Sequence, residues 1–155
     1  PLSTLRTFDN PDDFIYRRGA PDTFDAAAFQ SDLREIRNGI HPPTLSIPGF
    51  DHAIGDPQPN AHTYIRNAHR VVICEGLYLL HSSDGWEGTQ HLFDFRVFLS
   101  ADIDDCVDRL KERNKCVPGY TPEEIDVRCD AVDRANARTV RRSRRFADLV
   151  VDSVA

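Results

Sequence analysis

Three short, continuous apolar runs separated by helical patterns constrain the fold of this chain more than any other feature. The runs cover residues 71–74, 95–99 and 149–151, and each has the length of a strand that helices cover on both faces. Strands that alternate with helices form parallel sheets through helical crossovers, so the sequence predicts a three-layer α/β fold. Three strands are few for such a sheet, and we therefore expect it to be incomplete at the N-terminus.

The segments between these runs show helical periodicity. Phe29 and Leu33 lie four residues apart, as on one helix face, and Gly39 marks the end of that helix. Residues 102–114 repeat the pattern with an apolar stripe of their own. A capping box that begins at Thr121, with proline at the next position, then opens a long further helix.

The proline-rich stretch 40–62 lacks this periodicity. We expect a long ordered loop there, with a short edge strand at 44–47. The chain contains no internal repeat and no linker, so residues 1–155 are predicted to form a single domain.

Composition limits the partners of the chain. A formal net charge of −6 is the wrong sign for a protein that binds nucleic acid through its phosphates. The arginine-rich residues 141–145 end a predicted helix, where cations complement the helix dipole, so we do not expect them to bind nucleic acid. No stretch approaches the roughly 18 consecutive apolar residues of a membrane span. Four cysteines without a Cys-x-x-Cys pair indicate a reducing compartment, which is the cytosol or an organelle matrix, and of these we expect the cytoplasm.

Glu75 follows the first apolar run directly, and Gly76 comes after it. Open α/β sheets bind their ligands outside the carboxyl ends of the strands, which is where this carboxylate would lie. A carboxylate there can hold Mg²⁺ together with nucleotide phosphates. A solvated glutamate at a strand end has the same spacing, so the residues alone leave both interpretations open.

Two polar pairs are candidate substrate contacts. Arg17 and Arg18 precede a Gly-Ala-Pro turn and could bind an anionic group, although a solvated surface pair is the alternative. Asp51 and His52 follow an Ile-Pro-Gly-Phe segment. An aspartate beside a histidine can bind hydroxyl groups or act as base and orienting group, whereas an Asx turn is the alternative.

Arg109 and Arg113 lie four residues apart, on the predicted helix face opposite the apolar stripe. A loop and a second helix follow, an arrangement that could form a lid. Arginines on a closing lid neutralise the charge of a transferring phosphoryl group. The alternative is ordinary pairing along the helix with Asp105 and Asp108.

Taken together, these segments resemble the uridine kinase/phosphoribulokinase/pantothenate kinase family of P-loop small-molecule kinases, and most of all its kinase-like fungal and bacterial branch. The resemblance implies a P-loop kinase-type parallel sheet and transfer of the γ-phosphoryl of Mg·ATP to a hydroxyl of a small metabolite. It also implies roles for single residues. Glu75 would serve the metal; Arg109 and Arg113 would be catalytic lid arginines; Arg17, Arg18, Asp51 and His52 would face the substrate; Asn136 and Arg138 would face the nucleotide. The segments that carry the resemblance are Arg17–Asp25, Phe50–Ala53 with Asp56–Pro57, Val72–Leu80, Arg109–Asn114 and Asp133–Arg138.

The sequence departs from that family at its start. The glycine-rich phosphate loop with its Lys and Ser/Thr is absent, and so is the family's Asp-Gly-Phe/Tyr-His segment, which holds the catalytic base. By the resemblance, Pro1 begins just after that second segment. Two classes therefore stay open: the substrate and lid portion of an ATP-dependent kinase, or a catalytically inactive binding or regulatory module. The acceptor could be nucleoside-, pantothenate- or sugar-like, and the chain could form a homodimer.

Overall fold

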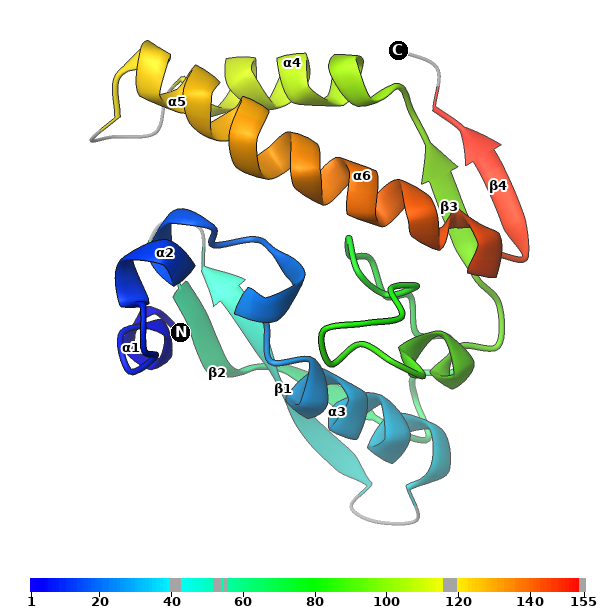
Figure 1. The fold of residues 1–155 in the computed structure, drawn as a ribbon. Coiled ribbons are helices and arrows are strands. Elements are labelled where there is room, and N and C mark those ends of the chain that lie inside the picture. Colours follow the sequence, from blue (N-terminus) through cyan, green and yellow to red (C-terminus); the bar gives the residue numbers. More distant parts are fainter. Residues whose placement is uncertain (40–42, 52–53, 55, 116–119, 154–155) are drawn as a thin grey trace. The chain divides into compact units, whose positions relative to one another are not determined.

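The computed structural model describes residues 1–39, 43–51, 54, 56–115 and 120–153, which form two compact units (Figure 1). The first unit contains Pro1–Arg18 and Asp25–Gly76, and the second contains Gly19–Phe24 and Leu77–Ala155. That these units make up one domain stays a prediction. Within the described residues, no helix combines the length and the apolar character needed to cross a membrane.

The first unit is built on an antiparallel hairpin. Its elements are α1 (Leu2–Leu5), α2 (Pro11–Tyr16), α3 (Ala26–Asn38), β1 (Thr44–Asp51) and β2 (Asp56–Ile65). In the hairpin, Leu45 lies opposite Tyr64 and Phe50 lies opposite Pro57. The prediction of a long loop at 40–62 is therefore wrong, although the edge strand expected at 44–47 forms part of β1. Prolines are tolerated here because each strand of a two-stranded sheet has one edge that needs no hydrogen bond.

Helix α3 forms where its periodicity predicts it. The Asp25 side chain accepts a hydrogen bond at 2.9 Å from a backbone N–H in the first turn, and Leu33 is buried. At the other end, the Arg66 guanidinium donates to the carbonyl oxygens of Glu35 and Ile36 at 2.9 and 3.1 Å. Both ends of the helix thus have partners for backbone groups that the helix itself leaves unbonded.

The second unit contains a parallel strand pair joined by helices. Val97 lies opposite Leu149 and Ser100 opposite Asp152, so the two strands run in the same direction. This confirms the α/β character and the strands expected near 95–99 and 149–151. The elements are η1 (Pro21–Thr23), η2 (Thr89–Leu92), β3 (Val97–Ser100), α4 (Ile103–Asn114), α5 (Pro122–Arg128), a π-helical turn η3 (Cys129–Asp133), α6 (Arg134–Ser143), η4 (Arg144–Phe146) and β4 (Leu149–Asp152).

The helices of the second unit pack through the predicted apolar stripes. Val107 of α4 is fully buried against Ile125 of α5 and Cys129 of η3, and Ile103 and Leu110 pack against this cluster. Burial of Cys129 raises the pKa of its thiol, which favours the protonated form. The α4–α5 pair is therefore held together by a small apolar core.

The strand predicted at residues 71–74 is not formed. In the described part of the chain no segment pairs with these residues, and the side chains of Val71 and Ile73 are 78% and 88% exposed. A strand of a parallel sheet exists only with a hydrogen-bonded neighbour, and its apolar side chains are buried only under helices. The apolar run is present in the sequence, but these residues have no such cover.

Candidate functional site

Arg18 and Asp56 bring distant parts of the first unit together. The Arg18 Nη2 donates to Asp56 Oδ1 at 2.7 Å, and the two side chains are 29% and 24% exposed. The same carboxylate accepts the backbone N–H of Leu2 at 3.0 Å. The Arg18 guanidinium also lies 5.7 Å from the centre of the Phe50 ring. A carboxylate, a guanidinium and an aromatic ring thus meet at the end of the β1–β2 hairpin where β1 ends and β2 begins.

Arg17 is held differently from its neighbour. Its Nε donates to Asp13 Oδ2 at 2.8 Å, one turn earlier in the chain, and its guanidinium lies 5.2 Å from the centre of the Phe14 ring. The predicted pair is therefore divided. Arg18 reaches across the fold to Asp56, whereas Arg17 pairs within its own helical segment.

The predicted Asp51–His52 pair is described only in part. The backbone of Asp51 ends β1 and lies opposite Asp56 in the hairpin register. His52 lies outside the described residues, so the role of the pair stays a prediction. Phe50 and Asp56 stand in segments that carry the family resemblance, but sequence reasoning gave neither of them a role at the site.

Glu75 is exposed and directly follows residues 71–74, which pair with no strand among the described residues. In the described part of the chain, no three Asp, Glu, His or Cys side chains gather in a way that could hold a metal ion. Mg²⁺ in nucleotide sites needs only one or two carboxylates, because phosphate oxygens and water complete its shell. A single accessible carboxylate fits that requirement.

Arg109 and Arg113 are both exposed on α4, away from the contact of Val107 with α5. Arg109 Nε donates to the backbone carbonyl of Asp105 at 3.3 Å. Its hydrogen bond thus goes to the main chain and not to a carboxylate of the helix surface. The expectation that the two arginines share the outer face of α4 is confirmed.

Asn136 and Arg138 lie on different faces of α6. The Asn136 side chain is buried, whereas Arg138 is exposed. Residues two positions apart on a helix point in nearly opposite directions, which explains the difference. The structure therefore does not bring these two predicted nucleotide contacts together.

An aromatic cluster, in which Tyr78 and Trp86 are buried and Phe24 is half exposed, holds the segment Gly19–Phe24 in the second unit. The Tyr78 hydroxyl donates to the carbonyl of Gly19 at 2.7 Å, and Trp86 Nε1 donates to the carbonyl of Pro21 at 3.1 Å. The Phe24 ring lies 5.7 and 6.1 Å from the rings of Tyr78 and Trp86. Sequence reasoning missed this cluster, because Tyr78 and Trp86 lie more than fifty residues after the segment that they contact.

Burial raises the pKa of the Tyr78 phenol far above its ordinary value, and the negative charges of Asp133 and Asp22 add to the effect. The phenol therefore stays protonated and remains a hydrogen-bond donor at any physiological pH. The Tyr78 hydroxyl thus holds the Gly-Ala-Pro turn at 19–21 through the carbonyl of Gly19. We take the cluster to be structural, since its polar atoms are engaged with the main chain.

Sequence comparison finds relatives along almost the whole chain. The ATP-dependent kinase-like protein notR' of Aspergillus versicolor is 33% identical over 148 residues, which cover 93% of this chain and 85% of the relative. A Schizosaccharomyces pombe protein described as "Putative uridine kinase C227.14" is 34% identical over 99% of this chain. The chain spans 65% of the length of that second relative.

Solved structures agree with these relatives. A "putative fructose transport system kinase" from Silicibacter sp. TM1040 has a TM-score of 0.77 at 30% identity, over 92% of this chain and 66% of its own. YFH7 from Saccharomyces cerevisiae, described as "a putative P-loop containing kinase with a circular permutation", has a TM-score of 0.85 over 99% of this chain and 55% of its own. At 21% identity the second likeness shows the fold alone. The fold is thus that of P-loop kinases. Since residues 15–155 also match the Phosphoribulokinase / Uridine kinase family, the chain belongs to that family.

Proposed function

We propose that this chain is the acceptor-binding and lid portion of an ATP-dependent kinase that phosphorylates a hydroxyl group of a small metabolite. The observation that carries the proposal is the family match over residues 15–155, joined to relatives described as an "ATP-dependent kinase-like protein" and a "Putative uridine kinase". Nucleoside-, pantothenate- and sugar-like alcohols are the acceptor classes that we consider. The proposed setting is the cytoplasm, with ATP and a small molecule as partners and a homodimer as the assembly to test.

The hairpin end is the proposed acceptor site. Asp56 presents carboxylate oxygens to which a substrate hydroxyl can donate, and Arg18 holds that carboxylate in place through its 2.7 Å hydrogen bond. The ring of Phe50 is half exposed, so it can lie against a sugar or base. Asp51 and His52 follow Phe50 directly in the sequence and are proposed to complete the site.

Helix α4 is the proposed lid arm. Arg109 and Arg113 point away from the apolar core of the helical pair and are accessible to a nucleotide. Lys111 Nζ donates to Asp130 Oδ2 at 2.8 Å, which ties the arm to the π-helical turn η3. Because these contacts and the apolar core join the helices, the pair can move as one body when a lid closes.

ATP and Mg²⁺ are the proposed cofactors. Glu75 would contact the metal, and bound Mg²⁺ would neutralise charge on the β- and γ-phosphates. Arg138 is exposed and could contact a nucleotide directly. We propose that the buried Asn136 acts by positioning α6 and not by reaching the nucleotide itself.

The second candidate is a binding or regulatory module without catalysis, the alternative that the sequence leaves open. The 155 residues contain no Gly-x-x-x-x-Gly-Lys-Ser/Thr loop, since the two lysines, Lys111 and Lys115, follow leucine and asparagine. The reading frame upstream of Pro1 separates the candidates. A glycine-rich Gly-Lys-Ser/Thr loop there would favour the kinase, and its absence would favour the module.

A further inference from the structure

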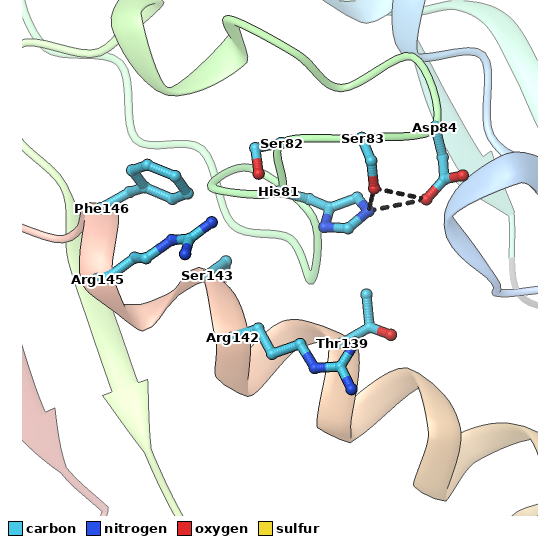
Figure 2. Close-up of a pocket in the computed structure, with 9 residues that line it drawn as sticks. All are labelled: His81, Ser82, Ser83, Asp84, Thr139, Arg142, Ser143, Arg145 and Phe146. Carbon is cyan, nitrogen blue, oxygen red and sulfur yellow. Dashed lines mark hydrogen bonds and ion pairs between the residues drawn. The ribbon is translucent and has the colours of Figure 1, made fainter.

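The second unit contains a cavity of about 280 Å³ that the proposed phosphoryl transfer does not use. Segment 81–84 forms one side of it, and the last turns of α6 with η4 form the other (Figure 2). The residues that matter for its chemistry are His81, Ser82, Ser83, Thr139, Arg142 and Arg145.

The position of the cavity separates it from the expected transfer site. Phe146 lines the cavity and precedes the first residue of β4, Leu149, so the cavity adjoins the amino end of that strand. Open α/β sheets bind their substrates outside the carboxyl ends of the strands, which here are Ser100 and Asp152. The cavity is thus at the opposite end of the β3–β4 pair.

On the loop side, three polar groups bind one another. Ser83 Oγ donates to Asp84 Oδ2 at 2.9 Å, and both oxygens lie within 2.9 Å of the same ring nitrogen, His81 Nε2. In a hydrolytic triad the serine and the carboxylate use opposite nitrogens of the histidine, so this arrangement is not one. The hydrogen bonds from His81 and Ser83 lower the pKa of Asp84, whose negative charge is thereby engaged within the loop.

On the helix side, two guanidinium groups face the cavity without an acidic partner. Figure 2 shows Arg142 and Arg145 on the helix opposite His81 and Ser83. In the described part of the chain, neither arginine forms an ion pair, although Arg145 lies 4.8 Å from the centre of the Phe146 ring. Two positive charges thus face one carboxylate that already has partners, and the cavity favours an anion.

We propose that this cavity binds a phosphate group, either as inorganic phosphate or as the phosphate monoester of a small metabolite. Guanidinium groups match phosphate oxygens with paired N–H donors, and the hydroxyls of Ser82 and Thr139 add neutral donors. A volume of about 280 Å³ is just below the range of drug-sized ligands, so it fits a phosphate with a short organic portion. The site is separate from the proposed acceptor site.

An NMR titration of the 155-residue chain tests the site without any assay of activity. The probes are inorganic phosphate and glycerol 3-phosphate, with glycerol as the uncharged control at the same ionic strength. We expect saturable shifts at residues 81–84 and 139–146, with a dissociation constant of roughly 0.1–1 mM for the tighter anion. The anion that binds more tightly identifies the source of the phosphate. Equal shifts with glycerol, or no saturation by about 10 mM of either anion, would overturn the proposal.

Two double variants with the same change in net charge sharpen the test. Arg142→Gln with Arg145→Gln removes the cavity arginines and should weaken binding at least about tenfold. Arg141→Gln with Arg144→Gln removes two exposed arginines that do not line the cavity, and binding should be unchanged. All four positions are exposed, so both variants should fold, which a well-dispersed NMR spectrum of each would show. Equal weakening in both pairs would mean diffuse attraction and would overturn the proposal.

Discussion

Arg18 and Asp56 are 38 positions apart in the sequence, and the guanidinium of one donates to the carboxylate of the other at 2.7 Å. The bond links the end of the α2 segment to the first residue of β2. Because the carboxylate also accepts the N–H of Leu2, it joins three parts of the first unit. The same two side chains are central to the proposed acceptor site, so under that proposal one contact would serve both stability and substrate binding.

The first prediction separates these two roles. A double-mutant cycle with Arg18→Ala and Asp56→Ala should give a coupling of roughly 0.5–1.5 kcal/mol in urea unfolding, because the pair is only partly exposed. The matched control is Arg17 with Asp13, a more exposed pair along one helical segment, for which we expect at most about 0.5 kcal/mol. Equal coupling in both cycles would contradict the distinction that we draw between Arg17 and Arg18.

The second prediction concerns Tyr78. Replacing it by Phe removes the hydroxyl that donates to Gly19 and keeps the ring contacts with Phe24 and Trp86. Loss of one hydrogen bond that leaves a carbonyl without its partner should lower the free energy of unfolding by roughly 1–2 kcal/mol. Hydrogen exchange should also speed up at the N–H of Thr23, which bonds within the held segment. Unchanged exchange there would show that Tyr78 does not fix the segment.

Local signals in the sequence predicted the elements that local interactions determine. The capping box at Thr121 forms as expected, with Thr121 and Glu124 bonding each other's backbone N–H groups. The stripe of α4 packs as its spacing predicts, since a helix face is defined by residues three and four apart. The strands β3 and β4 likewise appear within two residues of their predicted starts.

What the sequence did not predict depends on contacts between distant residues. Nothing near Tyr78 in the sequence indicates that its hydroxyl reaches Gly19, and nothing near Arg18 indicates Asp56. The strand predicted at 71–74 shows the converse error. Its apolar residues are a local signal for a buried strand, but a strand forms only beside hydrogen-bonded neighbours. The prolines of the hairpin led to the incorrect prediction of a loop for a related reason. A proline destabilises a strand only where its missing N–H would have bonded to a neighbouring strand, and the sequence does not show which strand edges are paired.

The third prediction is a pH dependence at Asp148. Arg96 donates to this carboxylate from its side chain and its backbone, and these bonds lower the pKa of Asp148 below its ordinary value of 3.8. The unfolded chain therefore protonates Asp148 more readily than the folded chain does. As a result, the free energy of unfolding rises with pH between the lowered pKa of the folded state and the ordinary pKa of the unfolded state. The contribution is present above the ordinary pKa and is lost as the pH falls through the lowered one.

Urea unfolding of the wild type and of Asp148→Asn near pH 5 and pH 3 measures this contribution. The variant should be less stable than the wild type at the higher pH, and the difference should shrink at the lower pH. Asp9→Asn, at an exposed position, is the control and should show no such change. If the difference in unfolding free energy between wild type and variant were the same at both pH values, the charge of Asp148 would not be what stabilises the fold.

The fourth prediction is that the 155-residue chain alone has no measurable kinase activity. Without a phosphate loop, no backbone N–H groups and no loop lysine hold the β- and γ-phosphates in line for transfer. Coupled assays of ADP release across nucleosides, pantothenate and sugars should detect turnover only in a form extended through the reading frame upstream of Pro1. Turnover by the short chain would mean that its phosphate site lies elsewhere.

The last prediction concerns Arg113 in such an extended enzyme. If its guanidinium acts on the transferring phosphoryl group, Arg113→Ala should lower kcat and kcat/KM together by roughly 10²–10⁴-fold. Arg113→Lys should recover only part of the loss, because an ammonium keeps the charge but lacks the paired donors of a guanidinium. Both variants should fold normally, since the residue is exposed on α4. Arg128→Ala, which removes the 3.2 Å contact with Asp133 near the π-helical turn, provides a structural contrast that should lower stability more than Arg113→Ala does. Normal turnover in a folded Arg113→Ala enzyme would leave α4 as a scaffold of the second unit and remove its assignment as a catalytic lid.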